Sequence, residues 1–323
     1  MERTQALREH AARLGVTAAI VLAGGEEVVS VGSVSRPVPV HSLRKSLLSA
    51  LYGQAHDAGL VDLRATLSEL GIDETPPLSA QQKAATVEDL LTARSGVYPA
   101  AAGHIGVPGR PTRGTHPPGT HWLYNNWDFN VLGNIYERIT HRSIYLAFDH
   151  EIAKPLGLID WDLWAHGAYE YRDDILGGTQ RYPNYTFMLS ARDLTRVGEL
   201  YRQRGHWNGH QLISESWIAT STQPHARTSF PPGLSGIYGY CWWVAGPESA
   251  SGQNGIPSGT FSATGFGGNY LTVVPPLDAV VATTVDIPTP KIRDAIQQDG
   301  AQRHALADDD YAEFLRDVVK TIQ

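Results

Sequence analysis

The sequence predicts an α/β (α+β) protein in which a sheet lobe, built from both ends of the chain, carries an inserted and mostly helical lobe. Runs rich in Val, Ile and Thr, typical of strands, occur near the start of the chain and return from about residue 238. Between them, residues 60–220 show helical periodicity, loops and many aromatic residues. We therefore assign residues 1–59 and 221–323 to the sheet lobe and residues 60–220 to the inserted lobe, with the active site in the cleft between them.

The individual elements follow from periodicity and turn residues. Residues 2–14 predict a helix, and residues 16–32 predict a hairpin around Gly24–Gly25. Residues 41–53, HSLRKSLLSALYG, have the apolar spacing of a helix with one buried stripe. Further helices are expected within residues 86–96, 128–140, 191–205, 215–222 and 308–323, and further strands within residues 238–246, 268–276 and 279–286.

Composition excludes several classes of partner. The chain has 323 residues, 42% of them hydrophobic and 18% charged, which is ordinary for a soluble globular protein. A net charge of −7 argues against nucleic acid and anionic membranes as partners. The single cysteine, Cys241, permits no internal disulfide. No apolar run approaches the roughly 20 residues of a membrane span, and the charged start lacks the apolar core of a signal peptide. We expect a cytoplasmic protein.

The segment HSLRKSLLSALYG places a hydroxyl beside an amine. At about 100° per residue, Ser42 and Lys45 share one helical face a turn apart, while Arg44 points elsewhere. A serine hydroxyl is a poor nucleophile until a base removes its proton, and burial lowers a lysine pKa by up to about 3–5 units. The pair is either a nucleophile beside its base or a helix start with a solvated lysine, since a chain of this length holds about one Ser-x-x-Lys by chance.

Two later segments could complete a site. Tyr124-Asn125-Asn126 lies between a Pro-Pro-Gly turn and a helix, where side chains can project into a cleft, although residues 182–184 share the bare Tyr-x-Asn pattern. Thr264-Gly265 leads into a β-rich run, where glycine allows a close backbone approach and an edge strand offers free N–H groups. The alternative for Thr264-Gly265 is a plain strand turn.

In this order the segments resemble the serine β-lactamase and penicillin-binding-protein superfamily, specifically its class C-like branch of β-lactamases, DD-peptidases, esterases and 6-aminohexanoate-dimer hydrolases. The resemblance runs through nearly the whole chain. It rests on SLRKSLLSALYG, LLTARSGV, PPGTHWLYNNWDFNVLG, LSARDLTRVGELYRQRGHWNGHQLISESWI and TGFGGNYLTVVP. It implies a β-lactamase/transpeptidase-like fold, with an antiparallel sheet flanked by helices.

The resemblance also implies roles for individual residues. Ser42 matches the nucleophile and Lys45 the neighbouring base, while Tyr124 matches the tyrosine that shuttles protons. Asn126 matches the amide that steadies the lysine and the substrate. The backbone N–H groups of Ser42 and Phe266 would form the oxyanion hole.

One departure from the family pattern concerns Ala263. The third motif usually carries lysine or histidine before Thr-Gly or Ser-Gly, and in β-lactamases and DD-peptidases this cation helps to hold the substrate carboxylate. Here Ala263 precedes Thr264 and Gly265, so charge-assisted recognition worth about 1.5–3 kcal/mol is absent. The departure favours neutral amides and esters.

Aromatic residues flank the expected cleft, and we expect two or three of them in the pocket. We place Trp127 and Tyr182 among the substrate-binding residues, with Tyr182 at the tip of residues 176–187, which form either a mobile substrate loop or a structural one. The full set is Trp122, Trp127, Trp161, Trp164, Tyr182, Tyr185, Trp242 and Trp243.

Taken together, these features favour a serine hydrolase that cleaves small amides or esters through an acyl-enzyme on Ser42. We expect no cofactor and no metal, because His206 and His210 are four residues apart in a glycine-rich turn rather than on a helix. The alternatives are a β-lactamase or DD-peptidase, and a non-catalytic binding or sensor module that keeps the fold. The sequence does not specify the acyl group, the leaving group or the oligomeric state.

Overall fold

An antiparallel sheet forms the centre of the computed structural model, which describes residues 2–103, 111–172, 179–228, 236–246, 255–287 and 308–323. Eight strands of this described part make the sheet: β1 (Ala18–Ala23), β2 (Glu26–Gly32), β8 (Ala226–Arg227), β9 (Ile237–Tyr238), β10 (Trp243–Val244), β11 (Phe261–Gly265), β12 (Asn269–Val274) and β13 (Ala279–Thr284). Their order across the sheet is β2-β1-β13-β12-β11-β10-β9-β8. Strands from the two ends of the chain therefore pair within one sheet, where β1 lies beside β13.

The remaining elements surround this sheet. β3 (Val38–Pro39), β5 (Thr179–Leu189) and β4 (Gly167–Arg172) form a second sheet, and β6 (His206–Trp207) pairs with β7 (His210–Gln211). The helices are α1 (Glu2–Arg13), α2 (Arg44–Asp57), α3 (Ala80–Lys83), α4 (Val87–Leu91), α5 (Asn126–Thr140), α6 (Ile144–Phe148), α7 (Lys154–Leu156), α8 (Ala191–Arg202), α9 (Glu215–Ser221) and α12 (Asp308–Ile322). Shorter helical turns are η1 (His41–Leu43), η2 (Asp149–Ala153) and η3 (Pro275–Leu277). The predicted first helix, first hairpin and last helix are confirmed.

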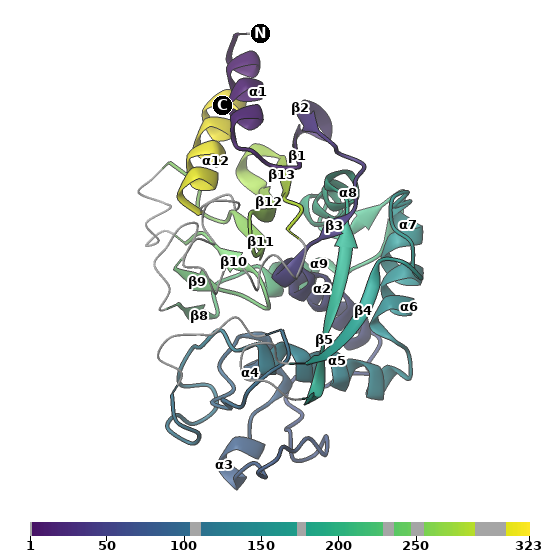
Figure 1. Cartoon of the computed structure of the whole chain (residues 1–323), viewed down its shortest axis with the longest axis vertical. Helices are drawn as coiled ribbons and strands as arrows, with labels where there is room; N and C mark the ends of the chain where they lie inside the picture. Colours follow the sequence, from purple (N-terminus) through teal and green to yellow (C-terminus); the bar gives the residue numbers. More distant parts are fainter. Residues whose placement is uncertain (1, 104–110, 173–178, 229–235, 247–254, 288–307) are drawn as a thin grey trace.

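Alternating side chains of β12 point into two different layers. On one face Tyr270 stacks on Tyr311 of α12, with ring centroids 3.8 Å apart, and the hydroxyls of Thr272 and Tyr311 lie 2.8 Å apart. On the other face Leu271 belongs to the core that includes residues of α2 and α8. Figure 1 shows α1 and α12 side by side beyond the sheet, and α2 on the side of the inserted lobe.

Helix α8 corrects the predicted lobe boundary. It lies within residues 60–220, yet it packs against β12 and β13. Gly198 makes this contact close, because a Cβ at that position would lie 2.4 Å from a side-chain carbon of Val280. Residues 191–202 therefore belong with the sheet, and the amphipathic pattern of the helix gave no sign of which partner its buried face would take.

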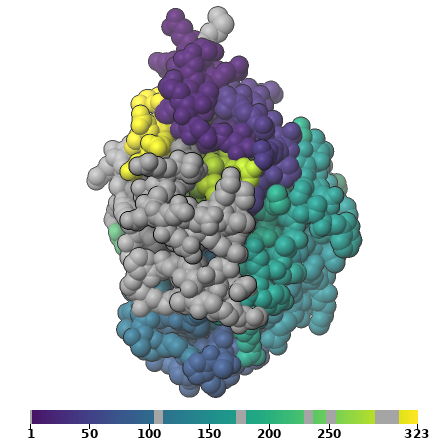
Figure 2. Space-filling model, viewed as in Figure 1, coloured from purple at the N-terminus to yellow at the C-terminus, as the bar shows by residue number. Residues whose placement is uncertain are grey.

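The inserted lobe is also less helical than predicted, because it contains the long hairpin of β4 and β5. Figure 2 shows its residues, coloured blue to teal, along the side and the end of the molecule away from α1 and α12. Within the described ranges, no helix is both long and apolar enough to span a bilayer.

Candidate active site

The predicted nucleophile and base lie at the junction of η1 and α2. Ser42 is in the η1 turn, and Lys45 is in the first turn of α2. The Lys45 Nζ lies 3.0 Å from the Ser42 Oγ, so the two side chains meet as the three-residue spacing predicts. Ser42 is partly exposed, whereas Lys45 is only 1% exposed. The pair therefore presents a hydroxyl to the surface and keeps the amine beneath it.

Two residues from the tyrosine segment complete the set around the amine. The Lys45 Nζ donates to the Tyr124 hydroxyl at 2.5 Å and to the Asn126 Oδ1 at 2.7 Å. Asn126 is oriented by its own amide, whose Nδ2 donates to the carbonyl of Gly103 at 2.6 Å. The amine also lies over the ring of Phe129, 4.4 Å from its centroid. The sequence-predicted residues Ser42, Lys45, Tyr124 and Asn126 thus converge on one nitrogen.

Burial shifts the pKa values of Lys45 and Tyr124 in opposite directions. It holds the pKa of Lys45 well below its usual range, and the charge of Arg44 lowers it further. Burial raises the pKa of Tyr124 above its usual range, although a hydrogen bond with Ser42 acts in the opposite direction. The two shifts favour the neutral form of both groups: the amine of Lys45 loses a proton more readily than a free lysine, and the phenol of Tyr124 less readily than a free tyrosine.

The end of β11 closely approaches the start of the η1 turn that carries Ser42. A Cβ on Gly265 would lie 2.1 Å from the carbonyl oxygen of Val40, so only glycine fits here without a shift. The rings of His41 and Phe266 meet edge to face, with centroids 6.1 Å apart. These contacts bring the segment of Phe266 to the segment of Ser42.

The prediction of an edge strand at residues 263–265 is wrong in part. β11 lies between β12 and β10, but β10 pairs only with Phe261 and Ser262. Ala263 and Gly265 extend past the end of β10, while β12 pairs with both of them. The strand is interior to the sheet, and its last residues lie beyond the short neighbour on one side.

Ala263 is fully buried, so it offers no surface to a substrate. It faces the same side of the sheet as Leu271, its partner in β12, and belongs to the core that includes α2. Thr264, which points to the opposite face, is partly exposed. The Ala263 side chain therefore brings no charge to this position and does not reach the surface.

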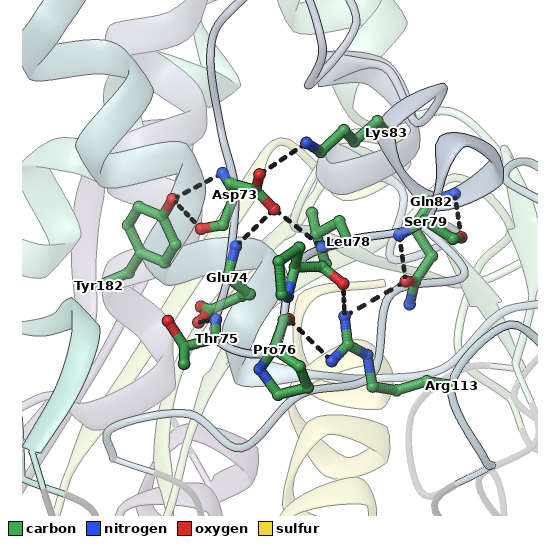
Figure 3. A network of polar contacts seen from close by, with 11 residues as sticks. Asp73, Glu74, Thr75, Pro76, Leu78, Ser79, Gln82, Lys83, Arg113 and Tyr182 are labelled. Atoms are coloured by element: carbon green, nitrogen blue, oxygen red, sulfur yellow. Dashed lines mark hydrogen bonds and ion pairs between the residues drawn. The ribbon is translucent and has the colours of Figure 1, made fainter.

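Trp127 and Tyr182 are not pocket residues, which corrects the sequence-based assignment. Trp127 is 1% exposed, and its Nε1 donates to the Glu74 Oε1 at 2.7 Å. Tyr182 lies within β5 rather than at a loop tip, and its hydroxyl donates to the carbonyl of Asp73 at 2.8 Å. Figure 3 shows this bond within the network that holds residues 73–83. The first part of the proposed substrate loop, residues 176–178, lies outside the described residues.

Two aromatic residues of the predicted set, Trp243 and Trp122, pack near Tyr124. The ring of Trp243 stacks on Tyr124, with centroids 5.7 Å apart and 29° between the planes. Trp122 packs near both of them, 6.4 Å from Tyr124 and 5.9 Å from Trp243. Trp242 is buried elsewhere in the core, and Trp164 is 89% exposed. Composition could not separate these cases, because it carries no information on which side chains come together in the fold.

Sequence reasoning missed the surroundings of Arg44. This side chain does point away from Ser42, as predicted, but it is buried at 3% exposure rather than solvated. Its Nε donates to the Asn184 Oδ1 at 3.1 Å, and its guanidinium lies over the ring of Tyr185, 4.3 Å from the centroid. Asn184 belongs to the second Tyr-x-Asn pattern, at residues 182–184. That pattern was the only feature of the sequence that drew attention to this residue.

A comparison with family models gives a match over nearly the whole chain. The family model described as Beta-lactamase matches residues 3–303 of the chain. No curated protein sequence matches it.

Solved structures share the fold at low sequence identity. A Caulobacter crescentus protein described as a penicillin-binding protein homolog superposes with a TM-score of 0.68 at 16% identity, covering 99% of this chain and 98% of that one. A Bacillus anthracis protein provisionally named a 6-aminohexanoate-dimer hydrolase gives 0.61 at 18% identity, covering 97% and 82%. EstCE1, described as a hydrolase with promiscuous acyltransferase activity, gives 0.64 at 13% identity, covering 98% of each chain. The predicted fold class is thereby confirmed.

Proposed function

Since the chain belongs to the Beta-lactamase family, we propose that it is a serine hydrolase that cleaves small, neutral amides or esters through an acyl-enzyme on Ser42. One observation carries the proposal. A buried amine, Lys45, lies within hydrogen-bond distance of a partly exposed serine hydroxyl and a tyrosine hydroxyl. Such a nucleophile with an adjacent base is the arrangement that acyl transfer requires.

Acylation begins when neutral Lys45 accepts the hydroxyl proton of Ser42 and the Oγ attacks the substrate carbonyl carbon. The resulting oxyanion accepts hydrogen bonds from the backbone N–H groups of Ser42 and Phe266, the two donors that we assign to the oxyanion hole. Tyr124 then gives its phenol proton to the leaving nitrogen or oxygen as the C–N or C–O bond breaks. The ammonium of Lys45 returns a proton to Tyr124 over the 2.5 Å contact. The net change is transfer of the Ser42 proton to the leaving group.

Deacylation repeats the same transfers with water as the nucleophile. A water molecule gives a proton to the Lys45–Tyr124 pair and attacks the ester carbonyl of the acyl-enzyme. The bond between the carbonyl carbon and the Oγ of Ser42 breaks, and the Oγ takes back a proton. The products are a carboxylic acid and the amine or alcohol released earlier, and each protein group returns to its starting state.

The surroundings of the site support a neutral substrate. Ala263 supplies no charge, and the aromatic side chains of Trp243 and Trp122 pack against Tyr124. An apolar or aromatic substrate group gains from contact with such a surface, whereas a carboxylate would be desolvated there without a cation at this position. The names of two structural neighbours, a 6-aminohexanoate-dimer hydrolase and a hydrolase with acyltransferase activity, accord with amide cleavage and acyl transfer.

A covalent label tests the proposal directly. Incubation with a fluorophosphonate should add one adduct to the intact protein, and peptide mass spectrometry should place it on Ser42. Ser42→Ala should abolish labelling, while Ser46→Ala, the same change four residues further on in α2, should keep it. Labelling that persists in Ser42→Ala, or no labelling of the unmodified protein, would contradict the proposal and favour a non-catalytic module.

A further inference from the structure

A cavity of about 360 Å³ lies between α5 and the β4–β5 hairpin, which Figure 1 shows beside each other in the inserted lobe. Its volume is within the range of small-molecule sites, roughly 300–1,000 Å³. The described residues that line it include none of those that converge around Ser42, namely Lys45, Tyr124 and Asn126. The cavity is therefore separate from the candidate active site.

The walls of this cavity are one face of a helix and one face of a hairpin. The lining residues of α5 recur every three or four positions, so they share one side of the helix. They are Asn130, Gly133, Asn134, Glu137 and, at the C-terminal cap, His141. The lining residues of the hairpin occupy every second position, so they share one face of the two strands. They are Tyr169, Tyr171, Arg181, Pro183 and Tyr185. The pairing of β4 with β5 places Tyr169 opposite Tyr185 on this face.

A helix that packs on strands normally does so through apolar side chains, and this contact departs from that rule. The α5 face presents two amides, a carboxylate and an imidazole, and Gly133 adds no side chain to fill the space. Asn130 is only 1% exposed, and its Nδ2 donates to the carbonyl of Ala102 at 3.0 Å, so a polar group is held at depth. Polar residues and free volume in place of a dry contact indicate a site for a polar ligand.

The described lining contains two guanidinium groups and one carboxylate. Arg142 and Arg181 carry the guanidinium groups, and Arg142 also pairs with Glu151. The carboxylate is that of Glu137, whose Oε1 already accepts hydrogen bonds from the Tyr169 hydroxyl and from the first backbone N–H of α6. The strongest donors toward a ligand are therefore the two guanidinium groups, whose flat, forked shape matches a carboxylate.

We propose that this cavity is a binding site for a small aromatic carboxylate. The side chains of Tyr169 and Tyr171, which are 37% and 50% exposed, offer two aromatic rings on one face of β4 to the ring of the ligand. The hydrogen bond to Glu137 holds the Tyr169 ring in place before a ligand arrives. The carboxylate of the ligand accepts hydrogen bonds from Arg181 and Arg142. The inference goes beyond the proposed function, because it uses none of the groups around the nucleophile.

Benzoate and benzamide are a matched pair of probes, because they share a ring and a planar head group and differ in charge. The unmodified protein should bind benzoate with a Kd of about 1 mM or tighter, and benzamide at least about 10-fold more weakly. NMR titration of the backbone amides measures both affinities. The amides that shift should belong to residues 130–144 and 169–171, not to Ser42 or Phe266. Equal affinity for the two probes, no saturable binding of benzoate, or shifts confined to the segment of Ser42 would overturn the proposal.

Substitutions in the exposed wall separate the contributions of charge and ring. Arg181→Gln should weaken benzoate binding about 10-fold or more and leave benzamide binding unchanged, because it removes a charged donor. Arg64→Gln is the matched control, since this side chain is 89% exposed and is not part of the lining. Tyr171→Ala should weaken both probes alike, by about 3–10-fold, because it removes a ring contact. Equal benzoate affinities of Arg181→Gln and Arg64→Gln would contradict the proposal.

Two further measurements define the ligand and its place. Ser42→Ala should bind benzoate as the unmodified protein does, whether or not the protein is a hydrolase. Loss of benzoate binding in Ser42→Ala would instead place the ligand in the candidate active site and refute the separate cavity site. Inorganic phosphate, an anion without a ring, should bind more weakly than benzoate. Tighter binding of phosphate would show that the tyrosines add nothing and would overturn the assignment to an aromatic carboxylate.

Discussion

The backbone of Gly265 lies against the carbonyl of Val40 so closely that a single added methyl group would lie 2.1 Å from its oxygen. This contact fixes the distance between two segments that are far apart in the sequence, the nucleophile turn and the end of β11. Both donors assigned to the oxyanion hole, Ser42 and Phe266, lie within two residues of this contact. The alignment of these two proposed donors therefore depends on glycine at position 265.

Gly265→Ala should push β11 away from the turn and misalign the two N–H groups. We expect kcat/KM for an ester to fall on the order of 10²-fold, which is the usual effect of losing one oxyanion-hole donor. Gly236→Ala is the matched control, because a Cβ there has no heavy atom within 4 Å. Equal activities of the two variants would show that the contact with Val40 is irrelevant to catalysis.

Lys45 and Tyr124 should behave as one proton-transfer unit. Lys45→Met or Tyr124→Phe alone should lower kcat on the order of 10²-fold or more, and the double variant should lose little beyond the worse single one. Tyr182→Phe should instead reduce stability by about 1 kcal/mol with little effect on kcat, because its hydroxyl bonds to Asp73. Steady-state kinetics and urea unfolding of the four variants test this, and multiplicative losses would show that the two groups act independently.

The buried amine of Lys45 should also make stability depend on pH. Its pKa is lowered in the folded protein, so between that value and the unfolded value of about 10.4 the unfolded chain binds more protons. Stability should therefore rise with pH across this window, by up to about 1.4 kcal/mol per pH unit from this group. Below the window the contribution is constant.

Lys45→Met removes that dependence, so the variant should be more stable than the parent near neutral pH, by about 1–3 kcal/mol. The advantage should shrink as the pH approaches 10. Urea denaturation at pH 7 and pH 9 measures the difference. A destabilised Lys45→Met at both values would mean that the hydrogen bonds of the amine outweigh its burial.

The buried position of Ala263 sharpens the prediction on substrate class. The unmodified protein should hydrolyse neutral esters or linear amides far better than nitrocefin. Ala263→Lys or Ala263→His should shift the ratio toward carboxylate-bearing substrates by at most about 10–100-fold. Because the site is fully buried, either change should also cost about 1–3 kcal/mol of stability by overpacking. A preference of the unmodified protein for nitrocefin would contradict the proposed substrate class.

Local relationships were predictable from the sequence, and long-range ones were not. Ser42 and Lys45 meet because a three-residue spacing on a helix fixes their geometry, and runs rich in β-branched residues marked β1 and β13 as strands. The contact between Arg44 and Asn184 joins positions 140 residues apart, and no periodicity announces it. The sequence also could not show that Trp127 is buried. A tryptophan at the start of a helix looks the same in the sequence whether its side chain faces a cleft or the core.

The pairing of β1 with β13 has a consequence for how the protein is made. The chain emerges from the ribosome with its N-terminus first, so β1 and β2 are made long before β13. The edge of β1 that pairs with β13 therefore has no partner during most of synthesis. Contacts of such high sequence separation fold slowly, because a long loop must close before any pairing energy is gained. During that interval the apolar strand Ala18–Ala23 is an unprotected template for strands of other chains. The same pairing that joins strands from the two ends of the chain therefore leaves an apolar strand without its partner until synthesis is nearly complete.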